Sequence, residues 1–169
     1  ILATASSRGT RVVRMGRGTV LARGPVRVRV LHPGPVPAQA GANDRSLVIR
    51  FSFGRFSALL TGDLERRGER ELLACGFPLE SGLLKVAHHG SRSATSDAFL
   101  AAAAPRWAVI SAGSRNPFGH PSPEVLKRLE RHRARTFVTA KLGAVTFETD
   151  GTRYAISSHV RGVLERGTL

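Results

Sequence analysis

Residues 83–91 read Leu83-Leu84-Lys85-Val86-Ala87-His88-His89-Gly90-Ser91. The first five form a short and mainly apolar run, which is typical of a buried strand. Two adjacent imidazoles, His88 and His89, follow at the point where this strand should end. Imidazole and carboxylate groups are the ligands that hold Zn²⁺ or Mn²⁺ in hydrolytic centres, so the segment indicates part of a metal site. A capped or solvated pair of histidines is the alternative that this motif alone leaves open.

Helices and strands alternate along the chain around this segment. Gly54-Arg55 is a two-residue turn of hairpin length between two apolar runs, and Asp150-Gly151 is another. Ser122 and Pro123 mark the start of a helix, as its N-cap and its first residue. The pattern predicts a sheet covered by helices, built partly of antiparallel hairpins and partly of β-α-β crossovers. The expected strands are residues 11–14, 26–31, 46–53, 56–60, 83–87, 107–111, 144–148 and 153–156; the expected helices are 65–74, 96–103 and 123–132; a loop is expected over 32–43 and a loosely held tail from Ser158.

Three successive strands of this expected sheet finish in polar residues. Asp63 follows the first, His88 and His89 follow the second, and the loop after the third leads to His120. Because the carboxyl ends of parallel strands meet at one edge of a sheet, one Asp and up to three His are expected to converge there. Asp63 is suited to bridge two cations, and the small Gly62 before it lets the backbone approach closely. Asp63 is also placed to cap the following helix, and the two roles are compatible.

Further candidate residues lie in the loops around these strand ends. His120 stands between Gly119 and Pro121, which hold it without burying it in a core, and this placement suits a substrate contact or a proton donor. Ser91 is a candidate hydrogen-bond donor to a phosphate group, although serines after a strand more often cap the next helix. Asn116, in the same loop as His120, is a further candidate for a substrate contact.

The chain is strongly basic, and the imbalance is local. It has 169 residues with 26 Lys and Arg against 12 Asp and Glu, and no acid occurs before Asp44. The amino-terminal quarter is therefore a positive surface that attracts polyanions, which makes DNA or an anionic membrane surface the natural partner. Arg27 and Arg29, which alternate with valines on an expected strand, are candidate contacts to a DNA backbone. A coding bias towards arginine is the alternative explanation of this composition.

Length and cysteine content limit the class of protein. A chain of this length is one ordinary domain, and its lone cysteine, Cys75, excludes an intramolecular disulfide and a cysteine-rich metal site. No stretch approaches the roughly 20 apolar residues of a membrane span, and no signal peptide is visible, so the segment itself is expected to be soluble. The chain starts at Ile1, in the middle of a plausible element, and we expect a piece of a longer protein.

Five motifs occur in a fixed order along the chain: Asn43-Asp44-Arg45-Ser46-Leu47-Val48-Ile49, Leu60-Thr61-Gly62-Asp63, Leu84-Lys85-Val86-Ala87-His88-His89-Gly90-Ser91, Phe118-Gly119-His120-Pro121 and Thr146-Phe147-Glu148-Thr149-Asp150-Gly151. This set resembles the carboxy-terminal half of the metallo-β-lactamase-like domain of the ComEC family, membrane proteins of DNA uptake in natural competence. The resemblance covers nearly the whole chain, from about Gly18 to Tyr154. The combination of motifs is far more selective than any one of them.

The resemblance implies a fold and a ligand set. The fold is α/β, an αββα sandwich of which residues 1–157 would form a partial domain and residues 158–169 a tail. Two divalent cations, Zn²⁺ or Mn²⁺, would lie at one edge of the paired sheets. Asp63 matches the bridging Asp of the family, and His88 or His89 matches a later His ligand. His89 is slightly favoured, since neighbours on a strand point to opposite faces and only one of the two can face the metal.

The sequence departs from the family pattern at the main ligand motif. That motif, His-x-His-x-Asp-His or His-x-Asp-x-Asp-His, belongs to the amino-terminal half of the fold, and no two histidines of this chain stand two residues apart. Either the chain is part of a longer protein that carries the motif, which we favour, or it represents a protein that has lost it. The cations are therefore expected to be only partly liganded by this chain. The upstream motif and membrane segments would come from the remainder of a longer chain, and the isolated chain is expected to be inactive.

The resemblance implies a metal-dependent phosphodiesterase or nuclease domain of a DNA-uptake protein in the bacterial cell membrane, facing outside or the periplasm. Asp63 and His120 would serve catalysis, and the arginine-rich strands would hold the DNA backbone. A non-catalytic DNA-binding or assembly module is one alternative, because the main ligand motif is absent. A phosphocholine esterase or another phosphodiesterase of the same fold is a second alternative, because related domains share the patterns at 43–48 and 88–91.

Overall fold

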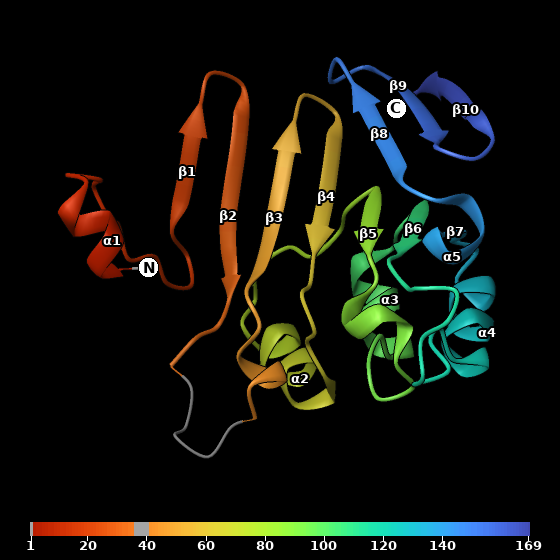
Figure 1. Ribbon diagram of the computed structural model, residues 1–169, viewed down its shortest axis with the longest axis horizontal. Helices are drawn as coiled ribbons and strands as arrows, with labels where there is room; N and C mark the ends of the chain where they lie inside the picture. The colour runs from red at the N-terminus through yellow and green to blue at the C-terminus, as the bar shows by residue number, and fades with distance from the viewer. Residues whose placement is uncertain (1, 36–40) are drawn as a thin grey trace.

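The computed structural model describes residues 2–35 and 41–169, which form two sheets with helices beside them (Figure 1). Residues 36–40, part of the loop expected over 32–43, lie outside the described residues. The strands are β1 (Val20–Arg23), β2 (Val26–His32), β3 (Val48–Phe53), β4 (Phe56–Leu60), β5 (Leu83–Lys85), β6 (Trp107–Ile110), β7 (Arg135–Val138), β8 (Val145–Thr149), β9 (Arg153–Ser158) and β10 (Gly162–Thr168). The helices are α1 (Leu2–Ser7), α2 (Arg66–Ala74), α3 (Asp97–Ala103), α4 (Pro123–Arg131) and α5 (Thr139–Leu142), with short 3₁₀ turns η1 (Asn43–Arg45) and η2 (Ala87–Gly90).

The larger sheet has seven strands in sequence order, from β1 to β7. Strands β1 to β4 pair antiparallel, and Gly54, with a φ of 56°, makes the tight turn between β3 and β4. Strands β4 to β7 are parallel, with α2, α3 and α4 in the three crossovers. The carboxyl ends of β4, β5, β6 and β7 therefore lie at one edge of the sheet.

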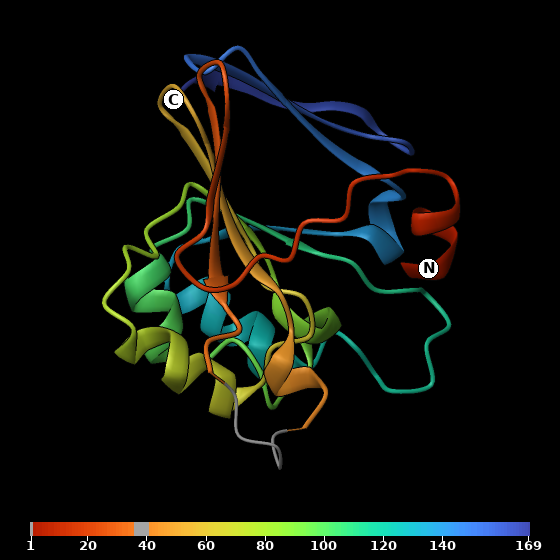
Figure 2. The ribbon, with the colours of Figure 1, turned by 90° about the vertical axis from the view of Figure 1, so that its left-hand side faces the viewer.

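One face of this sheet packs against α2, α3 and α4, which lie together on that side of the molecule (Figure 2). Leu59, Leu84 and Ile110 point into this core from β4, β5 and β6, and none of them is exposed to solvent. Leu72 of α2 and Leu129 of α4 meet them from the helices. Burial of each such side chain contributes about 1.5–3 kcal/mol. The core thus holds rigidly the three strands whose ends carry the polar residues.

The second sheet, in the order β10-β9-β8, covers part of the opposite face (Figure 2). Trp107 on β6 is only 1% exposed, and its ring centroid lies 4.6 Å from that of Tyr154 and 5.2 Å from that of Phe147. Towards β1 and β4 the cover is incomplete, since Leu21 is 49% exposed and Leu60 is 37% exposed. Within the described residues, the first four strands therefore present an apolar surface that is only partly covered.

The amino-terminal stretch differs from the prediction. Residues 11–14, expected as a strand, lie in no helix or strand, and β1 forms later, at Val20–Arg23. Val12 and Val13 remain at least half exposed, at 50% and 58%. Alternation of apolar and charged residues produces a strand only where a neighbouring strand can pair with it, and no strand pairs with this stretch in the described structure.

The carboxyl terminus also differs from the prediction of a loosely held tail from Ser158. Strand β10 pairs with β9 over residues 162–168. Its Glu165 accepts hydrogen bonds from Tyr154 Oη at 2.6 Å and from Trp107 Nε1 at 3.3 Å. The predicted tail is therefore an integral strand, held by partners far away in the sequence.

The other expected strands and helices are confirmed, with small shifts at their ends. The architecture is mixed α/β, with a large mixed sheet and helices, as expected at that level of description. Across residues 2–35 and 41–169, no helix combines the length and apolar character that crossing a membrane requires.

Candidate functional site

The carboxyl edge of the parallel strands gathers the residues that the sequence singled out. In the register of the sheet, Leu60 at the end of β4 pairs with Lys85 at the end of β5, and Lys85 pairs with Val109 of β6. Asp63 comes three residues after Leu60, and the His88-His89 pair follows Lys85 at a similar distance. The predicted convergence of these strand ends is confirmed by the parallel register.

Asp63 and His89 form the exposed half of the cluster. His89 Nε2 lies 3.7 Å from Asp63 Oδ1, and each side chain is about half exposed. The Asp63 amide donates to Ser46 Oγ at 3.1 Å, which fixes the backbone of this residue. The carbonyl oxygen of Gly62 accepts a hydrogen bond from the His88 amide at 3.1 Å. Gly62 has a φ of 55°, and the absence of a side chain lets the two backbone segments approach closely, as expected.

The ring of His89 is oriented by a backbone carbonyl. His89 Nδ1 lies 2.7 Å from the carbonyl oxygen of Ser111, which can only accept a hydrogen bond. Nδ1 must therefore carry the proton, and Nε2 of the neutral ring keeps its lone pair on the side of Asp63. A histidine whose other nitrogen donates to a carbonyl is the usual arrangement of a metal-ligating imidazole.

The two adjacent histidines do not alternate as they would on a strand. Strand β5 ends at Lys85, and His88 and His89 lie in η2 with φ values of 46° and 54°. This left-handed backbone is uncommon for residues other than glycine, and it turns both rings towards the same edge. The argument from strand alternation therefore does not apply to this pair, and which of the two histidines would face a metal stays a prediction. The ring centroids of His88 and His89 are 6.3 Å apart, and those of His88 and His120 are 5.9 Å apart.

Glu65 is a member of the cluster that the sequence did not single out. Its Oε1 lies 3.0 Å from His88 Nδ1 and accepts a hydrogen bond from Asn43 Nδ2 at 3.3 Å. Glu65, and not Asp63, occupies the N-cap position of α2, without a capping hydrogen bond from its side chain. The spacing of two residues between Asp63 and Glu65 was the signal available in the sequence, since it places both carboxylates near the same strand end.

His120 enters the cluster from the loop after β6. The Asn116 amide holds this loop, because Oδ1 accepts from the His120 amide at 2.9 Å and Nδ2 donates to the His120 carbonyl at 2.7 Å. Desolvation lowers the pKa of His120, and the nearby His88 and His89 lower this pKa further, so its neutral form is favoured. His120 Nδ1 is buried without a hydrogen-bond partner among the described residues. The amide of Asn116 is occupied within the loop, and its contact with substrate stays a prediction.

A hollow opens between these side chains. It has a volume of about 300 Å³ and is lined by His89, Ser111, Asn116, Phe118 and His120, among others. Ser91 lies beside it, with its Oγ 3.0 Å from Ser93 Oγ. Ser91 does not cap the next helix, because Ser96 does so by accepting from the Phe99 amide. Its role as a phosphate donor stays a prediction.

Two predicted contact residues lie outside this cluster. Arg27 and Arg29 on β2 line a separate hollow of about 200 Å³ together with Arg50. Arg29 pairs with Arg50 in the sheet, and its guanidinium lies 5.5 Å from the ring centroid of Phe77. The structure therefore does not bring these two arginines together with Asp63 and the histidines.

The donor set fits part of a metal coordination sphere. Across the described residues, no group of three or more His, Cys, Asp or Glu side chains is arranged to hold a metal ion. The ligand types present are Asp63 Oδ1 with Nε2 of His89, and Glu65 with His88. His120 Nδ1 is a buried ring nitrogen without a hydrogen-bond partner among the described residues, whereas His88 Nδ1 contacts Glu65 Oε1 at 3.0 Å. These groups are suited to Zn²⁺ or Mn²⁺, but they lie in pairs, and within the described residues no three of them are arranged around one ion.

The fold and the cluster together define an α/β domain that gathers histidines and carboxylates at the carboxyl ends of its parallel strands. Comparison with curated proteins finds 36% identity to ComE operon protein 3 of Bacillus subtilis over 147 residues, which is 87% of this chain. Competence protein ComA of Neisseria gonorrhoeae is 38% identical over 62% of the chain, and recombination protein 2 of Haemophilus influenzae is 36% identical over 69%. Comparison with models of known protein families finds no match.

The chain belongs to the ComEC family of competence proteins, of which these relatives are members. It spans only 19%, 15% and 14% of the lengths of these three relatives.

Proposed function

We propose that this chain is the carboxy-terminal half of a metallo-β-lactamase-like domain, which hydrolyses phosphodiester bonds of DNA during natural competence. The observation that carries the proposal is the geometry of His89, whose Nδ1 donates to the Ser111 carbonyl while Nε2 faces Asp63 at 3.7 Å. In metal-ligating histidines one ring nitrogen usually donates to a carbonyl or carboxylate in this way, which leaves the other nitrogen for the metal. The names of the three relatives, two of which refer to competence, support the biological setting.

Each residue of the cluster has a role that its geometry supports. Asp63 and His89 would hold the cations, and Glu65 would position His88 beside them. Two divalent cations supply charge stabilisation to the phosphoryl group and to the leaving oxygen when they are bound. His120, with its lowered pKa, is neutral near pH 7 and can accept a proton or bind substrate. Ser91 would donate a hydrogen bond to a phosphate oxygen of the substrate.

The partly covered face of β1 to β4 supports the view that another sheet completes the domain. An αββα sandwich pairs two sheets face to face, and Leu21 and Leu60 lie on the face that such a partner would bury. The segment of the longer protein that supplies this partner sheet would also supply the remaining metal ligands. In this proposal the domain belongs to a longer protein of the bacterial cell membrane and acts on DNA outside the cytoplasm.

Two alternative functions can be distinguished from the proposed hydrolase by experiment. A non-catalytic DNA-binding or assembly module is favoured by the small number of ligands within the described residues. An esterase for a small phosphodiester such as phosphocholine would use the same site. The hollow of about 300 Å³ does not by its volume distinguish a small phosphodiester from a nucleotide.

The test is a cleavage assay on the longer protein that contains this chain and the segment before it. We expect labelled single-stranded DNA to be cut when Mn²⁺ or Zn²⁺ is present, and to stay intact after treatment with a chelator. Re-addition of the metal should restore cleavage. Metal-dependent hydrolysis of a phosphocholine ester without cleavage of DNA would support the esterase instead, and the absence of both activities with intact DNA binding would support the module.

A further inference from the structure

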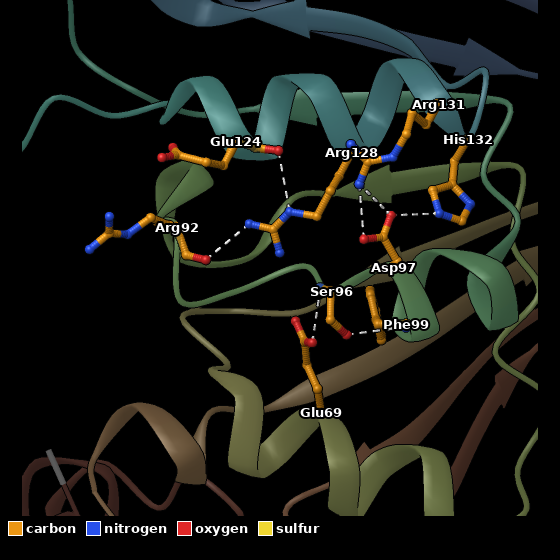
Figure 3. Close-up of polar contacts among 9 residues, drawn as sticks. All are labelled: Glu69, Arg92, Ser96, Asp97, Phe99, Glu124, Arg128, Arg131 and His132. Atoms are coloured by element: carbon orange, nitrogen blue, oxygen red, sulfur yellow. Dashed lines mark hydrogen bonds and ion pairs between the residues drawn. The ribbon is translucent and has the colours of Figure 1, made fainter.

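A second hollow, on the helix side of the sheet, is lined mainly by basic side chains. It lies between α2, α3 and α4, has a volume of about 430 Å³, and includes two carboxylates, Asp97 and Glu124. Its five cationic residues, called here the basic pocket, are Arg66, Arg92, Lys127, Arg128 and Arg131. Figure 3 shows Arg128 between α4 and the loop that carries Arg92.

Arg128 is a buried cation without an acidic partner. It is only 7% exposed, and its guanidinium donates to the carbonyl oxygens of Arg92 at 2.9 Å and of Glu124 at 3.3 Å. None of the ion pairs among the described residues includes Arg128. Burial and the nearby Arg66 lower the pKa of Arg128, while the carboxylates of Asp97 and Glu69 partly oppose this shift. A buried charge of this kind is costly unless an anion balances it.

The carboxylates around the pocket neutralise only part of its positive charge. Asp97 receives both hydrogen bonds from Arg131, at 2.9 Å each, and a contact from His132 Nε2 at 3.1 Å (Figure 3). Glu69, below the pocket, accepts from the backbone amides of Thr95 and Ser96. Three further cations, Arg66, Arg92 and Lys127, are exposed and make no ion pair among the described residues. Glu124 at the rim is the one remaining carboxylate of the pocket lining that could balance them. The pocket is therefore positive as a whole.

The basic pocket is continuous with the histidine cluster. A third hollow, of about 450 Å³, shares Arg92 and Glu124 with the basic pocket. The same hollow shares Phe118 and His120 with the hollow beside His89. Ser91 and Ser93 line the stretch between them. An extended ligand that occupies the histidine cluster can therefore reach the basic pocket along the surface of the loop after η2.

We infer that the basic pocket binds a backbone phosphate of a single nucleic-acid strand, another part of which lies at the histidine cluster. The second part of this inference rests on the proposed function. Arginine forks bind phosphate oxygens in pairs, and a concave site lined by several of them recognises a phosphate without reading a base. An anionic membrane surface is the less suitable occupant, because it presents its charges on a plane and the pocket is recessed and has no apolar anchor among its lining residues.

The test uses two charge reversals of exposed residues, R92E and K127E, and a matched control, R166E. Arg166 on β10 is also exposed and lies on the second sheet, so its reversal changes the net charge by the same amount away from the pocket. Binding of a fluorescent single strand of mixed sequence is followed by anisotropy in chelator, so that no cleavage occurs. We expect each pocket variant to weaken binding by about tenfold, and the slope of log K against log salt to fall by about 0.7 for each lost phosphate contact. R166E should change affinity less than about twofold.

Equal weakening by R166E, or unchanged binding in both pocket variants, would overturn the inference. So would the result that R92E and K127E lose binding to vesicles of anionic lipid and keep their affinity for the strand. The proposed function is judged separately, by cleavage in the presence of metal. If binding of the nucleic-acid strand depends on the basic pocket but the strand is not cut, the role of the pocket is supported and the proposed hydrolase activity is rejected.

Discussion

Replacing Asp63 with alanine is expected to reduce metal-dependent cleavage of single-stranded DNA by more than about 100-fold in the longer protein that contains this chain. Loss of a residue that merely supports a ligand typically costs about 10–100-fold in metal affinity or activity, and a bridging carboxylate should exceed that range. The fold should survive, because the Asp63 side chain is about half exposed and its backbone contact with Ser46 remains. Initial rates and metal affinity from calorimetry measure the effect.

Glu148→Ala is the matched control for this variant. Glu148 lies on β8, is exposed, and makes no side-chain hydrogen bond or ion pair among the described residues, so the same charge is removed away from the site. We expect its cleavage rate to equal that of the unaltered protein. Full activity in the Asp63→Ala variant would contradict the assignment of Asp63.

Replacing Gly90 with alanine is expected to destabilise the protein by about 2–4 kcal/mol, from left-handed strain and overpacking together. Gly90 has a φ of 82°, and a Cβ at this position would lie 2.7 Å from Pro121 Cβ and 3.3 Å from Ile110 Cγ2. Its carbonyl also accepts from the Ser122 amide at 2.9 Å. Alanine therefore forces apart the turn that carries His89 and the loop that carries His120. Urea unfolding measures the loss of stability.

Gly113→Ala provides the comparison. Gly113 lines the hollow beside His89 and His120, and a Cβ there would meet no atom within 4 Å. The free energy of unfolding of the Gly113→Ala variant should stay within about 0.5 kcal/mol of that of the unaltered protein. Indistinguishable unfolding midpoints for the two variants would show that the contact between the two loops is not tight.

Local signals in the sequence were sufficient for much of the fold. The turn at Gly54 joins β3 and β4 as predicted, because two residues between apolar runs leave few alternatives. Ser122 caps α4 by accepting from the Val125 amide at 3.3 Å, and Pro123 is its first residue, as the order of these residues predicted. The convergence of Asp63 and His89 followed from a general property of parallel strands. The metal role of these residues stays a prediction.

Features that depend on partners far away in the chain could not be predicted from local sequence patterns. Strand β10 is fixed by its pairing with β9 and by bonds from Trp107 and Tyr154 to Glu165, none of which leaves a local pattern. The left-handed turn at His88 depends on the Gly62 carbonyl, which accepts from the His88 amide across two strand ends. For the same reason Glu65 was not recognised as the neighbour of His88.

The position of the metal ion shows whether Asp63 and His89 are its ligands. Crystals of the longer protein, grown with Mn²⁺ or Zn²⁺ and measured at the absorption edge of that metal, give its position from anomalous scattering. We expect a peak about 2.0–2.2 Å from a carboxylate oxygen of Asp63 and from Nε2 of His89. If the protein cleaves DNA while its metal is bound elsewhere, with Asp63 and His89 free of it, these two residues are not metal ligands.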